Sequence, residues 1–456
     1  MASTYLYRTS GTSTDAQKFT MSFWLKRSSV GSAVNMLYYS GTGGTANADV
    51  DFTAADELSV YERDASSNSW QLKTTRVFRD LGAWYHLCIT GDSTLAETDR
   101  VKLYINGVRE TSFSTETYPT AAWNFEMNKS SEVRHIGKYT STPYYYDGLM
   151  SHFHFIDGTA YQASTFGETD STSGIWKIIT SPSVTYGNNG FFLKMEDRTN
   201  LDLDSSPNAH TFTTSGTFTP TYDNPSNNFA TWNPLNMTTV YQPTFSNGAT
   251  TCVSQDGSGN YWGSSSTLGF DSGKWYAEFK PISASNKPSF GICQAPNTHA
   301  YWESYLGKRL YDYAYVSDGT TYNNDSLGSG SWNTFTTGDI IGVAVDLDNL
   351  KIYFSKNGVW ENSGDPTSGA TGTGAAFTIT STAASTPGLE ANGYYHFACS
   401  DQSSGQDTMA ANFGNGYFQT TAVSSGNQDD AGEGDFEYDV PAGYYTLCTT
   451  NLGDQS

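Results

Sequence analysis

The length of its apolar runs is the sequence feature that most limits which fold this chain can adopt. Short runs rich in aromatic and β-branched residues, alternating or continuous, are separated by clusters of Gly, Ser, Asn, Asp and Pro. Such runs are typical of strands, and no segment carries a helical apolar stripe through three turns. We therefore predict an all-β protein. The clearest strands of the first half are expected at Phe19 to Leu25, Trp84 to Thr90, Val101 to Ile105, Leu149 to Ile156 and Gly190 to Met195.

Two matching hairpins indicate two domains of similar kind. LYING at Leu103 to Gly107 and YFSKNG at Tyr353 to Gly358 both end a strand in Asn-Gly, which supplies the positive φ of a two-residue turn. Each follows an apolar strand, WYHLCIT in the first case and DIIGVAVDLD in the second. The pattern predicts two antiparallel β-sandwiches.

The domain boundary is expected where proline and polar residues interrupt the strand pattern. PTYDNPSNNFATWNPL, from Pro220 to Leu235, has this composition. The chain is therefore divided into a first domain at 1–222, a linker at 223–237, a second domain at 238–420 and an acidic tail at 421–456. The tail is Gly, Asp and Glu rich and has too little apolar surface for its own core, so we expect it to be partly ordered at most.

The composition limits the classes of partner that this chain can bind. With 24 Lys and Arg against 46 Asp and Glu, the net charge of −22 argues against a phosphate backbone as ligand. No apolar run is long enough to span a bilayer, and the N-terminus lacks the pattern of a signal peptide. The five cysteines are widely spaced in mostly apolar runs without a CxxC, which predicts buried thiols made in a reducing cytosol.

Residues 1 to about 222 resemble a laminin G or concanavalin A-like jelly roll, through FTMSFWLKRS, WYHLCIT and VKLYINGV in the order of that family. Residues 238 to about 420 are similar to a SPRY domain, through LGFDSGKWYAEF, SFGIC, DIIGVAVDLDNLKIYFSKNGVW and AANFGNGYF. The two resemblances imply a jelly roll followed by a SPRY-type sandwich.

A third resemblance concerns the order of further segments. HIGKY, YYDGLMSHFHFIDGTAY, YGNNGFFLKMED, NNFATWNPL and the ending VPAGYYTLCTTNL are similar to virion-associated proteins of tailed bacteriophages. This implies a structural protein made in the host cytoplasm and displayed on the virion surface, as a tail fibre or receptor-binding protein or as a capsid decoration protein. Its partners would be other virion proteins and host-surface glycan, and unpaired sandwich edges would be covered in a homo-oligomer.

The sequence has no recognisable set of catalytic residues, so we predict a protein that is not an enzyme. Glycosidases need two carboxylates that flank one bond. Glu433, Asp435 and Glu437 alternate in GEGDFEYD, but this segment lies in the predicted tail. Adjacent Glu196 and Asp197 would point to opposite faces of a strand. A polysaccharide depolymerase remains the alternative from another class, and a cellular adhesion or peptide-binding SPRY module is a third.

Two histidines and several aspartates are candidate metal ligands. His152 and His154 are two apart and would share a strand face, but no third zinc ligand accompanies them. Asp346 and Asp348 are interpreted as turn residues. The loops rich in hard oxygen ligands predict calcium, with solvated loop acids as the alternative. The calcium candidates are Asp147, Asp157, Asp202 and Asp204.

Two aromatic loops are the remaining signal for recognition. Thr142 to Gly148 and His299 to Tyr322 concentrate Tyr and Trp, whose rings provide rigid amphipathic area for stacking on sugars or for a protein interface. The alternative is that these rings close sandwich edges or lie in the core. The predicted ligand-binding residues are Tyr144, Tyr145, Tyr146, Trp302, Tyr305, Tyr311, Tyr313 and Tyr315.

Overall fold

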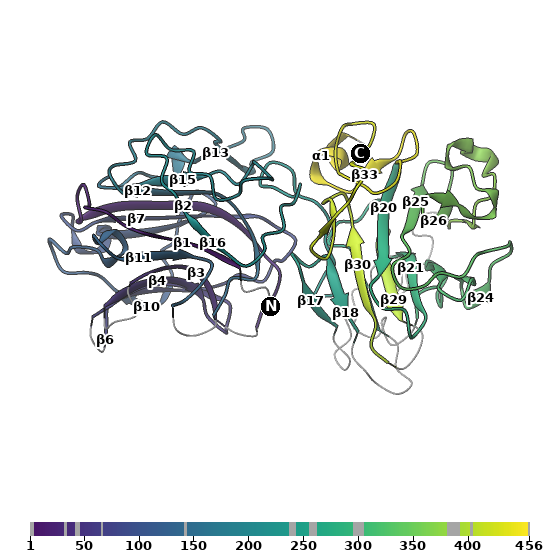
Figure 1. Ribbon diagram of the computed structural model, residues 1–456, viewed down its shortest axis with the longest axis horizontal. Coiled ribbons are helices and arrows are strands. Elements are labelled where there is room, and N and C mark those ends of the chain that lie inside the picture. The colour runs from purple at the N-terminus through teal and green to yellow at the C-terminus, as the bar shows by residue number, and fades with distance from the viewer. Residues whose placement is uncertain are drawn as a thin grey trace. The chain divides into compact units, whose positions relative to one another are not determined.

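The computed structural model describes residues 4–31, 34–41, 46–64, 67–140, 144–236, 243–254, 262–294, 305–380, 393–401 and 405–454 (Figure 1). The chain divides into two compact units, Met1–Pro220 and Thr221–Ser456. Nearly all regular structure in the described ranges is antiparallel β, and the α-helix found there, α1 (Thr449–Asp454), is short. The all-β prediction is confirmed. None of the described helices is long and apolar enough to cross a membrane.

The first unit pairs a large sheet with a smaller one. In the order of pairing, the large sheet comprises β10 (Phe113–Thr117), β6 (Ser67–Val77), β5 (Glu57–Asp64), β4 (Asn47–Phe52), β3 (Asn35–Ser40), β11 (Val133–Ile136), β1 (Tyr5–Thr9) and β16 (Thr213–Ser215). The smaller one comprises β15 (Phe191–Leu193), β12 (Gly148–Asp157), β2 (Lys18–Arg27), β7 (Tyr85–Asp92), β8 (Val101–Ile105) and β9 (Val108–Arg109). A separate pair joins β13 (Gly167–Thr169) to β14 (Trp176–Ile178). All five strands expected in this half overlap observed strands.

Alternating side chains of the two sheets form the aromatic core of the first unit. Phe23 on β2 stacks on Phe153 of β12 at 4.6 Å between ring centroids, and Tyr38 on β3 reaches Phe155 of β12 at 6.1 Å. All four side chains are fully buried. Because side chains alternate across a strand, every second residue of the large sheet points away from this core.

The described residues of the second unit form two main sheets and one short strand pair. One comprises β17 (Thr244–Ser246), β18 (Thr251–Val253), β30 (Thr408–Asn412), β20 (Lys274–Pro281), β25 (Ile341–Asp346), β26 (Lys351–Lys356) and β27 (Val359–Trp360), with β28 (Phe377–Thr378) on β26 and β33 (Tyr445–Thr446) on β20. The other comprises β19 (Trp262–Ser265), β29 (His396–Asp401), β21 (Pro288–Cys293), β22 (Tyr313–Val316), β23 (Thr321–Asn323) and β24 (Ser326–Leu327). β31 (Tyr417–Phe418) pairs with β32 (Thr421–Ala422). Short 3-10 turns are η1 (Glu97–Asp99), η2 (Glu126–Asn128), η3 (Ala163–Thr165), η5 (Glu361–Ser363) and η6 (Pro366–Thr371).

Both predicted Asn-Gly hairpins are present. Asn106 and Gly107 join β8 to β9 with φ of 47° and 78°, and Asn357 and Gly358 join β26 to β27 with φ of 50° and 77°. Positive φ at both central residues is the geometry of the turn that Asn-Gly favours. The five cysteines are buried thiols, as expected.

The predicted linker at 223–237 belongs to the second unit. Ala230 and Trp232 are fully buried in its core, and the Trp232 backbone N–H donates to the Ala249 carbonyl at 2.8 Å. The prolines did interrupt the strand pattern, but the residues between them pack. In the sequence, the boundary between the two units falls between Pro220 and Thr221, two residues before the predicted end of the first domain.

The C-terminal segment is ordered and packed, so the expectation of a partly ordered tail is wrong. Figure 1 shows this segment, in yellow, with β33 and α1 against one end of β20. The buried Glu278 carboxylate on β20 accepts the backbone N–H groups of Glu437 at 2.9 Å and Tyr438 at 2.8 Å. Phe436 is fully buried at 5.1 Å from the Tyr276 ring. The segment needs no core of its own because its apolar residues complete that of the second unit.

Replacing Phe436 by Ala tests this packing. We expect a loss of about 3–5 kcal/mol in the free energy of unfolding of the second unit, measured by denaturant titration, because a fully buried ring would leave a cavity. Val359→Ala, at a side chain that is 71% exposed, is the control and should change stability little. Equal stability of the two variants would mean that the segment does not contribute to the core.

Candidate functional site

Aromatic side chains gather on the outer face of the large sheet in the first unit. Tyr5 and Tyr7 on β1 flank Leu6, which points into the core, so both tyrosines face outward. His135 on β11 lies opposite Tyr7 in the strand register, and the two rings stack at 5.7 Å. Tyr39 on β3 lies opposite His135 at 5.9 Å. Three adjacent strands thus place rings side by side on one face.

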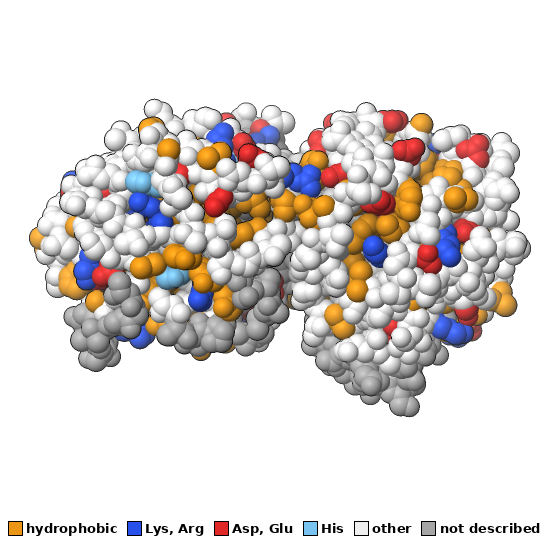
Figure 2. All heavy atoms as spheres, viewed as in Figure 1, with side chains coloured by type: hydrophobic (Ala, Val, Ile, Leu, Met, Phe, Trp, Pro, Cys, Tyr) orange, Lys and Arg blue, Asp and Glu red, His pale blue; other side chains and the backbone are white. Residues whose placement is uncertain are grey.

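The segment after β11 extends this row. Lys138 Nζ lies 4.3 Å from the Tyr5 ring centroid and 5.9 Å from that of Tyr145. Tyr139 meets Tyr39 edge to face at 4.8 Å and lies 6.3 Å from Tyr144. We call this set the tyrosine face: Tyr5, Tyr7, Tyr39, His135, Lys138, Tyr139, Tyr144 and Tyr145. In Figure 2, orange side chains surround a pale blue histidine near the place where Figure 1 labels β1, β3 and β11.

The tyrosine face is polar, aromatic and weakly cationic. Tyr144 is 38% exposed, and its neighbours except buried Tyr39 are half-buried. A hydrogen bond with Ser215, together with Lys138, lowers the pKa of Tyr5. Burial, assisted by Lys138, lowers the pKa of His135 to about 4, so its imidazole is neutral at physiological pH. Fixed rings with hydroxyl groups and one ammonium can stack on a sugar and hydrogen bond with its hydroxyls.

Of the predicted cluster at Tyr144 to Tyr146, the first two residues belong to this face and the third does not. The Tyr146 hydroxyl donates to the Lys26 carbonyl at 2.8 Å and lies 3.2 Å from the Leu149 carbonyl oxygen, and its ring packs against the core. Burial raises the pKa of Tyr146 well above its usual value. Tyr146 is therefore a structural residue.

The second predicted aromatic cluster is described only in part, and its strand residues face the core. Tyr313 and Tyr315 on β22 are fully buried in the second unit, where the Tyr315 hydroxyl donates to the Asn333 carbonyl. Tyr311 packs against the same core, and the Tyr305 hydroxyl bonds to Asp325. The prediction for Tyr313 and Tyr315 is wrong because alternate tyrosines of a central strand fill the core. Trp302 lies outside the described residues.

The predicted calcium ligands do not converge either. The buried Asp157 carboxylate accepts the backbone N–H groups of Thr14 at 2.9 Å and Asn189 at 3.0 Å, and the Asn128 amide at 2.7 Å. Such donors saturate a carboxylate and leave it no need for a cation. In the part of the chain that the structure describes, no three His, Cys, Asp or Glu side chains are grouped to hold a metal.

The other three predicted calcium ligands differ from one another in their burial and hydrogen bonds. Asp204 accepts the backbone N–H groups of Phe192, Ser206 and His210 at 2.7–2.9 Å. Burial raises the pKa of Asp147, whereas Asp202 lies half-exposed in a turn. Asp157 and Asp204 are parts of the fold, because each accepts backbone N–H groups of the loops around it.

His152 and His154 both lie near the Phe192 ring, at 5.7 Å and 3.8 Å between ring centroids, although a bulge shifts the register of β12 between Ser151 and His154. His152 has a left-handed backbone with φ of 49°, and its Nε2 lies 3.2 Å from a Glu196 carboxylate oxygen. His154 stacks on Phe192 at 3.8 Å, and its Nδ1 hydrogen bonds with the Tyr186 hydroxyl. Among the described residues, no third side chain joins them in a group that could hold a metal.

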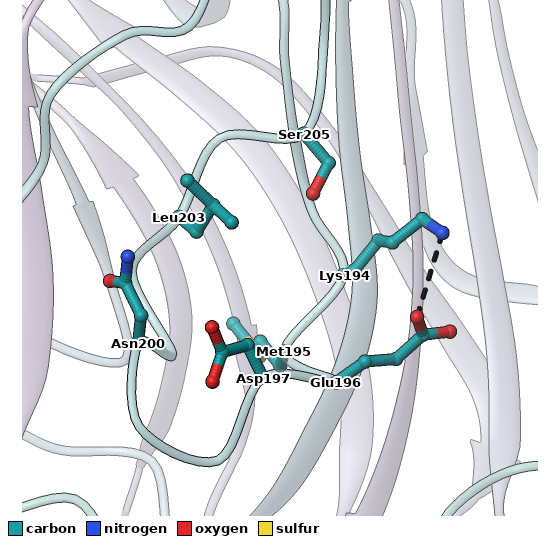
Figure 3. A pocket seen from close by; sticks show the side chains of 7 residues that line it. All are labelled: Lys194, Met195, Glu196, Asp197, Asn200, Leu203 and Ser205. Carbon is teal, nitrogen blue, oxygen red and sulfur yellow. Dashed lines mark hydrogen bonds and ion pairs between the residues drawn. The ribbon is translucent and has the colours of Figure 1, made fainter.

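A small hollow lies beside this bulge (Figure 3). Its volume is about 140 Å³, and its lining is Lys194, Met195, Glu196, Asp197, Asn200, Leu203 and Ser205. The Asp197 carboxylate accepts the Thr199 backbone N–H at 2.9 Å, and Lys194 Nζ lies 3.5 Å from Glu196. The polar groups are engaged with one another around a turn, and the hollow is small for a drug-sized ligand.

Sequence reasoning missed two carboxylates on the face that carries the tyrosines. Asp49 and Asp51 alternate on β4 with the core residues Ala48 and Val50, so they point outward, yet they are 0% and 5% exposed. Burial raises the pKa of Asp49 to about 7, and burial together with repulsion from Asp49 raises that of Asp51 to about 8. The alternation in NADVDF was the signal that could have identified them.

The acids of GEGDFEYD have structural partners. Glu433 accepts the Asn227 amide at 2.8 Å, Glu437 accepts the Ser424 backbone N–H at 2.7 Å, and Asp435 is buried. These contacts tie the C-terminal segment to the second unit.

Exchanging Asp157 for Ala tests its structural role. We expect a loss of about 3 kcal/mol in the free energy of unfolding of the first unit, because several buried donors lose their acceptor. Asp202→Ala should lie within about 0.5 kcal/mol of the wild type. Thermal unfolding in EDTA and in calcium checks the account, and a loss that appears only in calcium would restore Asp157 as a ligand.

Residues 2–164 match the family model described as the Concanavalin A-like lectin/glucanases superfamily, which supports the predicted jelly roll in the first unit. No curated protein matches the chain.

Among solved structures, the SPRY domain of human HERC1 matches at 17% identity, covering 40% of this chain and 96% of that chain, with a TM-score of 0.29. The TRIM65 PSpry domain matches at 11% identity over 40% and 91%, with a TM-score of 0.28. A heptameric SAP-like pentraxin from Limulus polyphemus matches at 14% over 41% and 88%, also with a TM-score of 0.28. These distant similarities assign no function.

Proposed function

We propose that this chain is a non-enzymatic structural protein of a tailed-phage virion that recognises a host-surface glycan through the tyrosine face. The observation that carries the glycan part is the continuous row of rings from Tyr5 to Tyr144 on one sheet face. The match of residues 2–164 to a lectin and glucanase superfamily supports the same conclusion.

The arrangement of the rings suits a saccharide better than an apolar ligand. Tyr5, Tyr7 and His135 lie within 5.7–5.8 Å of one another, so their positions are fixed before a ligand arrives. Rigid tyrosines lose little side-chain entropy on binding. Their hydroxyls and the Lys138 ammonium add hydrogen-bonding groups around the rings. A sugar has the same combination of apolar ring faces and peripheral hydroxyls.

The virion part rests on the order of segments shared with virion-associated phage proteins, from HIGKY to VPAGYYTLCTTNL. The net charge of −22 suits a surface that carries many copies at high local density, because like charges keep neighbouring copies soluble. The partners are then other virion proteins and the host glycan.

A polysaccharide depolymerase is the second candidate, and Asp49 and Asp51 are the observation that favours it. A retaining glycosidase uses two carboxylates about 5 Å apart, with one protonated acid and one ionised nucleophile. Here burial raises both pKa values, to about 7 and 8, so the environment does not separate an acid from a nucleophile. Asp49 is also fully buried. We therefore favour binding over hydrolysis.

Tyrosine substitutions test the glycan site. Tyr5→Ala and Tyr145→Ala should each weaken binding to polysaccharide extracted from the host envelope by about fivefold, because each removes one ring from the row. Isothermal titration calorimetry with the full chain measures the affinity, and size analysis of the polysaccharide after incubation reports any cleavage. Tyr305→Ala in the second unit is the matched control. Unchanged affinity in both variants of the tyrosine face, or cleavage of the polysaccharide, would contradict the proposal.

Imaging of purified virions tests the virion part of the proposal. Cryo-electron microscopy should place density of this chain on the particle, either following the capsid lattice, as for a decoration protein, or as a small symmetric set at the tail, as for a receptor-binding protein. Particles that lack the chain altogether would refute the virion assignment and leave the glycan site to be judged by the titrations.

A further inference from the structure

We propose that Cys252 and Cys399 form a redox-controlled cross-link site, at which a mild oxidant joins the two main sheets of the second unit through a disulfide bond. The inference concerns the core of the second unit alone, so it holds whether or not the chain binds a glycan or belongs to a virion. It adds a covalent modification to two of the buried cysteines, which are free thiols in this structure.

The two thiols reach each other from opposite sheets. Cys252 is the middle residue of β18, in the sheet that contains β30 and β20, and Cys399 lies on β29, in the sheet that contains β19 and β21. Both side chains are fully buried in the shared core, where their Sγ atoms are 3.7 Å apart. The sulfurs are therefore in van der Waals contact, although 147 positions separate the two residues in the sequence.

A disulfide requires a small movement from this geometry. Its S–S bond is about 2.05 Å long, so the two sulfurs must approach each other by roughly 1.7 Å. The strands beside the pair are short, because β17 and β18 have three residues each and β19 has four. In the described part of the chain, β17 and β19 are also the terminal strands of their sheets. Few ladder hydrogen bonds resist a shift there, so the strands can follow the two cysteines as they close.

The surroundings of the pair suit an uncharged disulfide. In the strand register, Phe245 and Met409 lie opposite Cys252, and Phe290 lies opposite Cys399. Burial, assisted by Cys252, raises the pKa of the Cys399 thiol well above its usual value, so this thiol is protonated at physiological pH. Among the described residues, no third His, Cys, Asp or Glu joins the pair in a group that could hold a metal. The chemistry open to two such thiols in contact is their oxidation.

Hydrogen peroxide is an oxidant small enough for this site, because it is little larger than water and needs only a local opening of the short strands. One sulfur attacks a peroxide oxygen as the thiolate, the O–O bond breaks, and a sulfenic acid forms while the hydroxide takes up the thiol proton as water. The second sulfur then attacks the sulfenic sulfur and displaces its hydroxyl, which leaves as a second water with the remaining thiol proton. The two thiols lose two electrons, and peroxide gains them.

The cross-link makes the stability of the second unit depend on the redox state of its surroundings. It closes a loop between residues 147 positions apart, and a long closed loop removes much conformational entropy from the unfolded chain. In a reducing cytosol both thiols stay free, whereas an oxidising medium outside the cell preserves a disulfide. A chain made in the cytosol therefore gains stability once it meets the oxidising medium.

Oxidation of the full chain gives the first test. The folded protein is treated with one equivalent of hydrogen peroxide, and its disulfides are mapped by mass spectrometry of peptides kept under non-reducing conditions. We expect a linked pair of peptides that contain Cys252 and Cys399, with a rise of about 5–10 °C in the Tm of the second unit that dithiothreitol reverses. Oxidation only to sulfinic or sulfonic acids, a disulfide that joins Cys399 to Cys293, or a linked pair without a rise in Tm would overturn the proposal.

Alanine substitutions give the second test. Cys252→Ala and Cys399→Ala should each abolish the rise in Tm on oxidation, because neither variant keeps both sulfurs. Each variant is compared with its own reduced form, so a loss of packing at the substituted site does not affect the comparison. Cys88→Ala, at a buried thiol of the first unit, is the matched control and should keep the rise of the wild type. A rise that persists in Cys252→Ala or Cys399→Ala would contradict the assignment of the cross-link to this pair.

Discussion

The division of each strand into an inward and an outward face is the constraint on which the first unit depends. The aromatic core between the two sheets takes one residue of every two, from Phe23 and Phe153 to Val50 and Phe52. The outward-facing residues of the large sheet are therefore held in position by the core packing of their inward-facing neighbours. Tyr5, Tyr7 and His135 form a preorganised row for this reason.

Buried carboxylates are the second organising element of this acidic chain. Glu278 fixes the C-terminal segment by accepting two backbone N–H groups, and Asp157 and Asp204 fix loops of the first unit in the same way. Much of the acidity that suggests a solvated surface is thus used inside the fold. Asp49 and Asp51 differ from these acids, because burial raises the pKa values of both.

Local signals in the sequence predicted the local features of the fold. Period-two runs located the strands of the first half, and the Asn-Gly pairs at Asn106 and Asn357 located both hairpins, because these depend on neighbouring residues only. The C-terminal segment was misjudged because its order comes from Glu278, about 160 residues away in the chain. No composition rule reports such a contact.

The candidate site was predicted only in part for the same reason. Tyr144 and Tyr145 stand out as a cluster in sequence, but Tyr5 and Tyr39 join them only through the pairing of β1, β11 and β3. Tyr313 and Tyr315 have an equally aromatic sequence, and the central position of β22 directs them into the core. Sequence shows which residues are aromatic, whereas the register of the sheet decides which of them meet at a surface.

The most direct test is a structure of the full chain in complex with an oligosaccharide released from the host envelope. The account predicts sugar density against the rings of Tyr5 and Tyr145, with hydroxyls near Lys138 and no cleaved product. Sugar bound only at the second unit, or a cleaved glycan beside Asp49 and Asp51, would contradict it.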